Sequence, residues 1–210
     1  MMNPKMKDIP DIVVGRLPVY LRALSRMMQA GQQVTSSKEL GERLGISSAQ
    51  IRKDLSHFGE FGKQGTGYQI PYLVEQLKRI LKVGNEWHVA LIGMGDIGHA
   101  LTHYNGFVTR GFHIVLLFDN DPNKIGTTIN GLVVMDATNL VEEIRARGVK
   151  MAMLAVPAEK AQEVANRLVE AGVEGILNYA PINLTVPPNV RVQHIDPVIH
   201  LQRMTFYIDS

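Results

Sequence analysis

Two features are missing from this sequence. It contains no cysteine, so disulfides, thiolate metal ligands and cysteine nucleophiles are excluded. If the protein senses redox state, a bound ligand must therefore report it. No apolar run approaches the ~20 residues of a membrane span, and residues 1–8 are polar and charged, unlike a secretory signal. We expect a cytoplasmic protein with no membrane partner.

The chain has 210 residues, 45% of them hydrophobic, which is enough for one large or two small domains. Its net charge of +2 is unevenly distributed. Residues 1–84 hold 13 Lys and Arg against 7 Asp and Glu, whereas residues 85–210 hold 9 against 13. The net charges are thus +6 and −4. A basic first part predicts a polyanion-binding module on a separate body, although chance surface variation remains an alternative.

The segment from Trp87 to Asp119 has the pattern of a dinucleotide-binding unit. A strand-like apolar run, Val89–Ile92, leads into Gly93-Met94-Gly95-Asp96-Ile97-Gly98. The first glycine permits a tight turn, the second permits close approach to a pyrophosphate, and the third permits close helix–strand packing. Phosphates then sit at the positive end of the following helix. The expected apolar stripe of that helix is Ile97, Leu101, Tyr104 and Val108.

A second apolar run ends at Asp119, which comes 21 residues after Gly98. An acidic residue at about this distance accepts hydrogen bonds from the adenosine ribose hydroxyls. Its charge repels a 2′-phosphate, so NAD(H) is favoured over NADP(H). The alternative is that Asp119–Pro122 is only a polar turn after a strand.

Strand-like and helix-like segments alternate after Asp119, which predicts a doubly wound parallel sheet of the Rossmann type. Ligands bind such sheets at the carboxyl ends of strands. Two proline-containing segments follow predicted strands at these ends. They could line the cofactor site, or they could only turn the chain, and the sequence leaves both alternatives open. The predicted nucleotide contacts are Gly93, Met94, Gly95, Asp96, Ile97, Gly98, Asp119, Val156, Pro157, Ala180 and Pro181.

The basic first part has the layout of a helix-turn-helix. A helix beginning at Pro10 has apolar residues at three-to-four spacing, and Pro18 should kink or restart it. Ser36 and Ser47 each begin a capping pattern, and Gly45 ends the short helix between them. Two short helices joined by a glycine-containing turn favour DNA binding.

The second short helix has one apolar face and one polar face. Arg and Lys pair with guanine, and Gln pairs with adenine, in a major groove. The alternative is an ordinary solvated helix face. A glycine-rich segment, Phe58–Tyr68, then predicts a β-hairpin in the position of a wing, with Lys63 near its tip. The predicted DNA contacts are Ser47, Gln50, Arg52, Lys53, Ser56 and Lys63.

At this point the sequence resembles a known family, the redox-sensing transcriptional repressors called Rex. The resemblance covers essentially the whole chain, and its most specific run is Gln50–Tyr68. It also rests on residues 16–21, 93–98, 103–107 and 155–158. It implies a winged helix over 1–84, a Rossmann domain over 85–195 and a swapped carboxyl-terminal helix over 196–210.

The resemblance further implies a homodimer that binds a palindromic double-stranded operator as a repressor. NADH and NAD+ are the implied ligands, and NADH releases the DNA. Three switch residues match the family: Arg16 pairs with Asp196 in the DNA-competent form, and Tyr104 takes over Asp196 when NADH is bound.

Three alternatives follow from the residues. The chain could be an NAD-dependent oxidoreductase with a basic appendage, but no proton-transfer residue stands near a second substrate domain, so we expect no enzyme. A CoA-type ligand could replace NAD, which Asp119 argues against. His99 and His103, four residues apart, could share a metal, but no third ligand accompanies them and we expect none.

Overall fold

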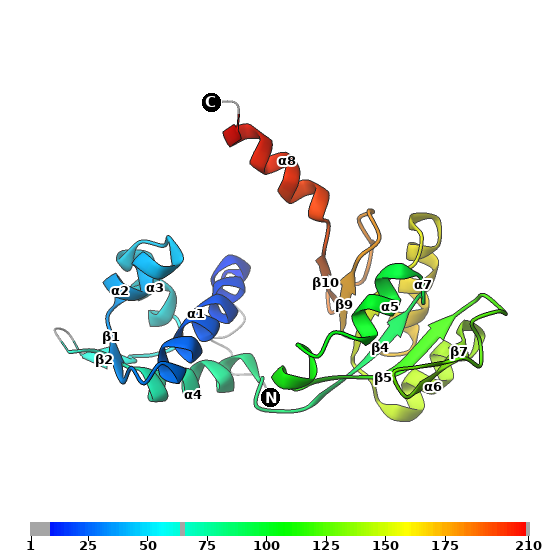
Figure 1. The fold of residues 1–210 in the computed structure, drawn as a ribbon, viewed down its shortest axis with the longest axis horizontal. Helices are drawn as coiled ribbons and strands as arrows, with labels where there is room; N and C mark the ends of the chain where they lie inside the picture. The colour runs from blue at the N-terminus through cyan, green and yellow to red at the C-terminus, as the bar shows by residue number, and fades with distance from the viewer. Residues whose placement is uncertain (1–8, 64–65, 209–210) are drawn as a thin grey trace. The chain divides into compact units, whose positions relative to one another are not determined.

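The computed structural model describes residues 9–63 and 66–208. The chain divides into two compact units, Met1–Asn85 and Glu86–Ser210. The elements of both are drawn in Figure 1. Each unit is built around its own hydrophobic core, so each is described by itself.

Helices form most of the N-terminal unit. Its elements are α1 Asp11–Gln29, β1 Val34–Thr35, α2 Ser37–Leu44, α3 Ser48–Ser56, β2 Gly62–Lys63, β3 Gly67–Gln69 and α4 Ile70–Leu81. The strands form a small antiparallel sheet in the order β1-β3-β2. The hairpin expected between Phe58 and Tyr68 is thus present as β2 and β3, and β1 adds a third strand that the sequence did not suggest.

Caps fix the short helices of this unit. The Ser36 hydroxyl accepts a hydrogen bond from the Glu39 N–H, and the Ser47 hydroxyl accepts one from the Gln50 N–H. Gly45 ends α2 in the left-handed conformation at φ 67°, where glycine is favoured. The helix-turn-helix therefore has the boundaries that the capping patterns predicted.

Pro18 does not restart the helix, which was one of the two expected outcomes, and the other, a kink at this residue, stays a prediction. α1 runs through it without interruption for 19 residues. The apolar face of this helix accounts for its continuity, because Leu17, Tyr20 and Leu24 are completely buried against the rest of the unit. Packing of that face outweighs the one backbone hydrogen bond that proline cannot donate.

A seven-stranded sheet forms the centre of the C-terminal unit, in the order β10-β9-β8-β4-β5-β7-β6. All neighbouring pairs are parallel except β6 with β7. The elements are β4 Trp87–Ile92, α5 Asp96–Thr102, β5 Phe112–Asp119, β6 Thr128–Ile129, β7 Leu132–Asp136, α6 Leu140–Arg147, β8 Met151–Leu154, α7 Ala158–Glu170, β9 Gly175–Asn178, β10 Arg191–His194 and α8 Pro197–Ile208.

Both faces of this sheet are covered. Alternate residues of the strands point to opposite sides, and Ala90 and Ile92 of β4 pack with the buried sides of α6 and α7. Val89 and Leu91 point to the other face, where Leu101 of α5 packs. The C-terminal unit is therefore the predicted doubly wound α/β fold, with a mixed sheet because of the edge strand β6.

The helix after the glycine turn is shorter than expected. α5 ends at Thr102, and a single 3-10 turn, Val108–Arg110, follows. Of the expected apolar stripe, Ile97, Tyr104 and Val108 are exposed, and Leu101 is partly buried. The prediction that one helix carries this whole stripe was therefore wrong, because Tyr104 and Val108 lie beyond the end of α5.

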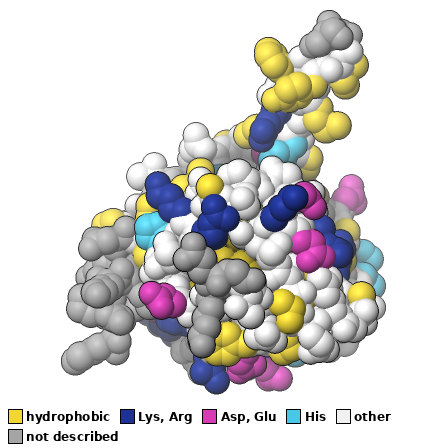
Figure 2. Space-filling view, turned by 90° about the vertical axis from the view of Figure 1, so that its left-hand side faces the viewer, with side chains coloured by type: hydrophobic (Ala, Val, Ile, Leu, Met, Phe, Trp, Pro, Cys, Tyr) yellow, Lys and Arg dark blue, Asp and Glu magenta, His cyan; other side chains and the backbone are white. Residues whose placement is uncertain are grey.

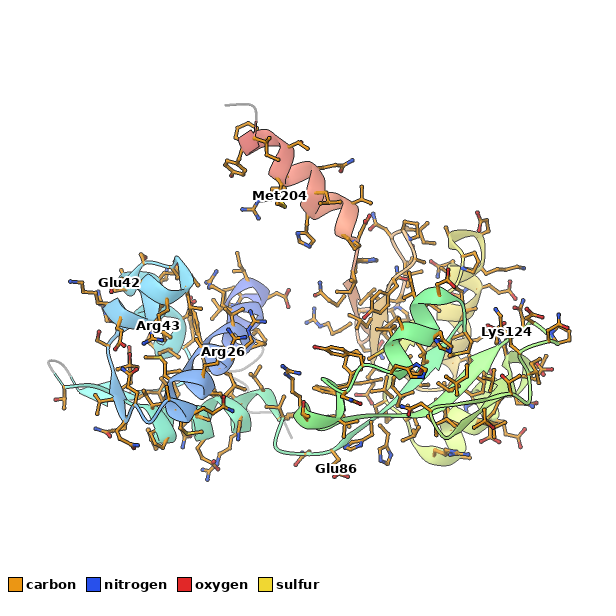
Figure 3. The ribbon with its side chains drawn as sticks, viewed as in Figure 1. Arg26, Glu42, Arg43, Glu86, Lys124 and Met204 are labelled. Carbon is orange, nitrogen blue, oxygen red and sulfur yellow. The ribbon has the colours of Figure 1, made fainter. Side chains whose placement is uncertain are left out.

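The last helix, α8, is apolar and exposed. Within Pro197–Ile208 no residue is buried, and Leu201 and Met204 each keep more than half of their surface accessible. Figure 2 shows these hydrophobic side chains in yellow at the top, and Figure 3 labels Met204. In the described ranges, no helix is both long enough and apolar enough to cross a membrane.

Candidate nucleotide and DNA sites

The predicted nucleotide contacts lie together at one edge of the sheet. They follow four adjacent strands: Ala180 and Pro181 after β9, Val156 and Pro157 after β8, Gly93–Gly98 after β4, and Asp119 at the end of β5. The chain goes from β4 to β5 on one side and returns to β8 on the other, so the strand order reverses between β4 and β8. Ligands of open α/β sheets bind outside such a reversal.

Two of the three glycines are needed by the protein itself. Gly93 has φ 94°, and a Cβ there would overlap the carbonyl oxygen of Ala155, at the end of the neighbouring β8. A Cβ at Gly98 would overlap the carbonyl oxygen of Gly93. These glycines let the turn fold tightly and let α5 pack on it.

No contact of this kind requires a glycine at position 95. Its backbone angles of φ −77° and ψ −166° suit any residue. A Cβ there would meet no heavy atom within 4 Å among the described residues beyond its chain neighbours. Space kept open beside exposed backbone is what close approach of a pyrophosphate requires. The turn therefore fits a dinucleotide.

Asp119 holds this turn in place. It is buried, and its Oδ2 accepts a hydrogen bond from the Met94 N–H at 2.7 Å, while its Oδ1 accepts one from the Asp121 N–H at 2.9 Å. The ammonium of Lys124, labelled in Figure 3, lies 3.3 Å from Oδ2. Burial alone raises the pKa of the Asp119 carboxyl, but these donors outweigh it, so the pKa lies below its ordinary value.

Asn178 shapes the segment after β9, and sequence reasoning missed it. Its buried side chain accepts a hydrogen bond from the Ala180 N–H at 3.0 Å and donates to the carbonyl oxygens of Ala180 and Ile182. The turn before Pro181 is thus fixed by an asparagine at the end of a strand. An Asx-type turn at that position was the available signal.

The exposed face of α3 carries three of the six predicted DNA contacts. Arg52, Lys53 and Ser56 are exposed, and Ser47 is the N-cap of the helix. Arg52 donates a hydrogen bond to the Ser37 hydroxyl of α2 at 3.0 Å. Figure 2 shows several Lys and Arg side chains on the side of the molecule that faces the viewer. The side chain of Lys63 lies outside the described part of the chain.

Gln50 belongs to a different arrangement, centred on Asp54. Asp54 is completely buried, and Arg16 binds it through Nε at 2.6 Å and Nη2 at 2.7 Å. Tyr20 donates its hydroxyl to Oδ2 at 2.6 Å, and the Gln50 Nε2 donates to Oδ1 at 2.7 Å. We call these four residues the Asp54 network. It joins α1 to α3.

Opposing effects set the ionisation of this network. Burial raises the pKa of Asp54, but hydrogen bonds from Arg16, Tyr20 and Gln50 lower it further, and the net pKa lies below its ordinary value. The hydrogen bond to Asp54 raises the pKa of Arg16. Burial and then the same carboxylate raise the pKa of Tyr20. Asp54 is therefore an ionised carboxylate with neutral tyrosine and charged arginine partners.

Sequence reasoning missed Asp54 and Tyr20. Asp54 lies four residues after Gln50, on the border of the apolar face of a helix whose outer face is basic. An exposed carboxylate at that place would repel DNA phosphates. In a helix that binds DNA, its presence was therefore a signal that the carboxylate is buried and paired. Its partner lies 38 residues away, beyond any local pattern.

The three predicted switch residues belong to different units. Arg16 lies in the N-terminal unit and binds Asp54. Tyr104 is exposed in the C-terminal unit, and its ring packs edge-on against Phe107 with the centroids 4.9 Å apart. Asp196 caps α8 through a hydrogen bond from the Val198 N–H at 2.9 Å. Their pairing as a switch stays a prediction.

His99 and His103 lie side by side, with ring centroids 4.6 Å apart. The Nδ1 of His103 is 2.9 Å from the His99 carbonyl oxygen. Over residues 9–63 and 66–208, no three His, Cys, Asp or Glu side chains gather closely enough to hold a metal ion.

The Asp54 network predicts a pH-dependent stability. Because the pKa of Asp54 is lower in the folded chain, its stabilisation is complete above the ordinary value of 3.8 and is lost as the pH falls through the folded value. Asp54→Asn should reduce the free energy of unfolding at pH 7 by about 3 kcal/mol, because it leaves Arg16 without its charge partner. The difference from the parent chain should shrink below about pH 4.

Urea unfolding followed by circular dichroism between pH 7 and pH 3 measures this. Asp11→Asn is the matched control, because Asp11 is exposed at the start of α1. A stability difference for Asp54→Asn that stays constant across this range would contradict the assigned ionisation.

Known proteins match both units of the chain. A family model described as "CoA binding domain" matches residues 84–182, and one described as "Putative DNA-binding protein N-terminus" matches residues 8–56. A crystal structure of RSP in complex with β-NAD+ and operator DNA superposes with a TM-score of 0.91 at 33% identity, covering 96% of this chain and 93% of that one. The complex of RSP with β-NADH gives 0.88 at 31% identity, covering 96% and 95%.

Curated relatives match over almost their whole length. The redox-sensing transcriptional repressor Rex of Roseiflexus sp. (strain RS-1) is 49% identical over 97% of this chain and 93% of its own. The Rex repressor of Desulfitobacterium hafniense (strain DSM 10664 / DCB-2) is 44% identical over 98% of each chain. With this coverage of both units, the chain belongs to the Rex family of redox-sensing transcriptional repressors.

Proposed function

We propose that this chain binds operator DNA through α3 and the β2–β3 hairpin and binds NADH or NAD+ at the edge of the large sheet. NADH releases it from the DNA. The observation that carries the proposal is the full-length match to a Rex-family repressor, RSP, whose structures include β-NAD+ with operator DNA and β-NADH. In this chain, the open space at Gly95 and the exposed basic face of α3 fit those two ligands.

The three parts of the chain have separate roles in this proposal. Residues 1–84 contact DNA, residues 85–195 bind the nucleotide, and residues 196–210 join two subunits. If NADH favours a dimer geometry that cannot span two half-sites, it must weaken DNA binding by the same factor by which DNA weakens NADH binding. Transfer of Asp196 between Arg16 and Tyr104 is the proposed exchange between the two geometries.

The chain is a repressor and not an enzyme, since its relatives are named transcriptional repressors over nearly their full length. A dehydrogenase with a basic appendage is therefore not favoured. We place the protein in the cytoplasm, where a repressor meets its operator. Because one matching family model is described as a CoA binding domain, CoA remains the alternative ligand. Asp119 and the open Gly95 favour NAD(H), and competition between NADH and CoA measures the preference.

Operator binding tests the function directly. A palindromic duplex, selected by the protein from a randomised library, is labelled and titrated with NADH and separately with NAD+, and fluorescence anisotropy reports the bound fraction. NADH should release the duplex at concentrations where NAD+ has little effect. Binding that is indifferent to both nucleotides would reject the NADH response and leave only a DNA-binding protein.

Gly95→Ala should separate nucleotide binding from folding. Its backbone angles suit alanine, so the free energy of unfolding should stay equal or rise by up to about 1 kcal/mol. A methyl group in the space beside the turn should nevertheless weaken NADH binding at least about tenfold, because the pyrophosphate cannot approach the backbone. Thermal denaturation and calorimetric titration measure the two effects.

Gly98→Ala is the matched comparison. Its Cβ overlaps the Gly93 carbonyl oxygen, so it should destabilise the fold by about 1–3 kcal/mol. If Gly95→Ala binds NADH as well as the parent chain does, the pyrophosphate does not lie against this turn.

The exposed apolar surface of α8 predicts a homodimer. A contiguous apolar surface of this kind marks a protein–protein interface, and two-fold symmetry suits a palindromic operator. Leu201→Asp should convert the dimer to a monomer and weaken operator binding, because it places a charge in the interface. Light scattering after size exclusion gives the mass. Gln202→Asp, the next and also exposed residue, is the control; equal dimerisation of both variants would exclude this face of α8 from the interface.

A further inference from the structure

We propose that Asp54 is a positioning residue that fixes the side-chain amide of Gln50, so that Gln50 presents its Oε1 to DNA and contacts an adenine. The inference rests on the proposed function for the presence of DNA. It goes further, because it assigns to one buried carboxylate the choice of the base that the half-buried Gln50 contacts. The hydrogen bonds of the Asp54 network carry the argument.

The first step is the polarity of the Gln50 amide. Asp54 is ionised, so it only accepts hydrogen bonds, and Gln50 faces it with the donor Nε2 at 2.7 Å from Oδ1. A flipped amide would place Oε1 against the carboxylate and cost a hydrogen bond as well as an electrostatic repulsion. The oxygen and nitrogen of this amide therefore cannot exchange places without a large loss of free energy.

The second step is the rigidity of the carboxylate. Arg16 binds both of its oxygens, and Tyr20 donates to one of them, so Asp54 has its position fixed from α1. Such bidentate pairs set geometry as well as energy. A half-buried Gln50 is therefore held by a group that is itself immobile, unlike a glutamine on a solvated helix face.

The third step is what remains for DNA. Gln50 is the third residue of α3, and the N-terminal residues of a recognition helix contact base edges. With one N–H committed to Asp54, its amide offers an acceptor, Oε1, and one further N–H. Adenine presents an exocyclic amino donor and the N7 acceptor in the major groove, which matches both. Guanine presents two acceptors there, O6 and N7, and leaves Oε1 without a donor.

Base analogues test the contact with the parent chain. In the palindromic duplex selected from a randomised library, each adenine is replaced in turn by purine, which lacks the exocyclic amino group. At one adenine of each half-site, this change should weaken binding about fivefold to tenfold, as expected for one lost hydrogen bond. Gln50→Ala should bind the duplex with adenine and the duplex with purine at that position equally. Equal losses for Gln50→Ala and the parent chain at every adenine would overturn the contact.

Lys53→Ala is the matched control on the same helix. It removes an exposed charge, so it should weaken binding to every duplex by a similar factor. The loss of affinity on replacing the adenine that Gln50 contacts by purine, here called the purine effect, should stay the same. Failure to select any preferred duplex would count against the proposed function itself, which distinguishes that result from a failure of the Gln50 contact.

Asp54 is tested in two independent ways. Asp54→Asn can face Gln50 with either amide atom, so the amide of Gln50 is free to flip, and the purine effect should fall toward onefold. Tyr20→Phe removes another hydrogen bond from the same carboxylate without touching Gln50, and the purine effect should persist. A full purine effect in folded Asp54→Asn would overturn the positioning role.

Nuclear magnetic resonance gives the second test and needs no folded Asp54 variant. One side-chain amide proton of Gln50 should exchange with deuterium more slowly than the amide protons of Gln29, which is exposed at the end of α1. Loss of the signals in Gln50→Ala assigns them. Equal exchange for the two glutamines would mean that Asp54 does not fix the amide, and the proposal would fail.

Discussion

Asp54 can stay ionised inside the protein only because donors meet it on every side. A carboxylate that leaves water without partners is destabilising, and it becomes compatible with folding when hydrogen bonds and a charge replace its hydration. Arg16 and Tyr20 supply these from α1, and Gln50 supplies one from α3 itself. The position of α3 is therefore tied to α1 through the Asp54 network.

The C-terminal unit uses the same physics at its ligand edge. Asp119 is buried at the end of β5, and its donors are the Lys124 ammonium and two backbone N–H groups, including that of Met94 in the glycine turn. One carboxylate thus shapes the surface that a pyrophosphate would meet. The prediction that Asp119 contacts the ribose concerns the same side chain. Its burial shows that holding the turn is a role it has before any nucleotide arrives.

Local chemistry explains which features the sequence could predict. The glycine turn, the caps at Ser36 and Ser47 and the alternation of the large sheet depend on residues near one another in the chain, and each has the predicted place. β10 and the Asp54 network depend on partners far away in sequence. β10, for example, pairs with β9 at the edge of the sheet, and short strands of this kind have no distinctive local pattern.

The error at α5 has a similar origin. Ile97, Tyr104 and Val108 have helical spacing, and apolar residues at that spacing usually mark a buried face. Here they are exposed in the single chain, as is the apolar surface of α8. Apolar residues at helical spacing predict an apolar surface, but they do not show which part of the chain or which partner covers it.

Arg16 belongs both to the Asp54 network and to the predicted switch. Its guanidinium uses Nε and Nη2 for Asp54, and its side chain keeps 22% of its surface accessible. A carboxylate that approaches there acts on a group already bound to α3 through Asp54. Any change in that approach reaches Gln50 through two hydrogen-bonded contacts. The predicted transfer of Asp196 to and from Arg16 would therefore act on a group that is already joined to α3 through Asp54.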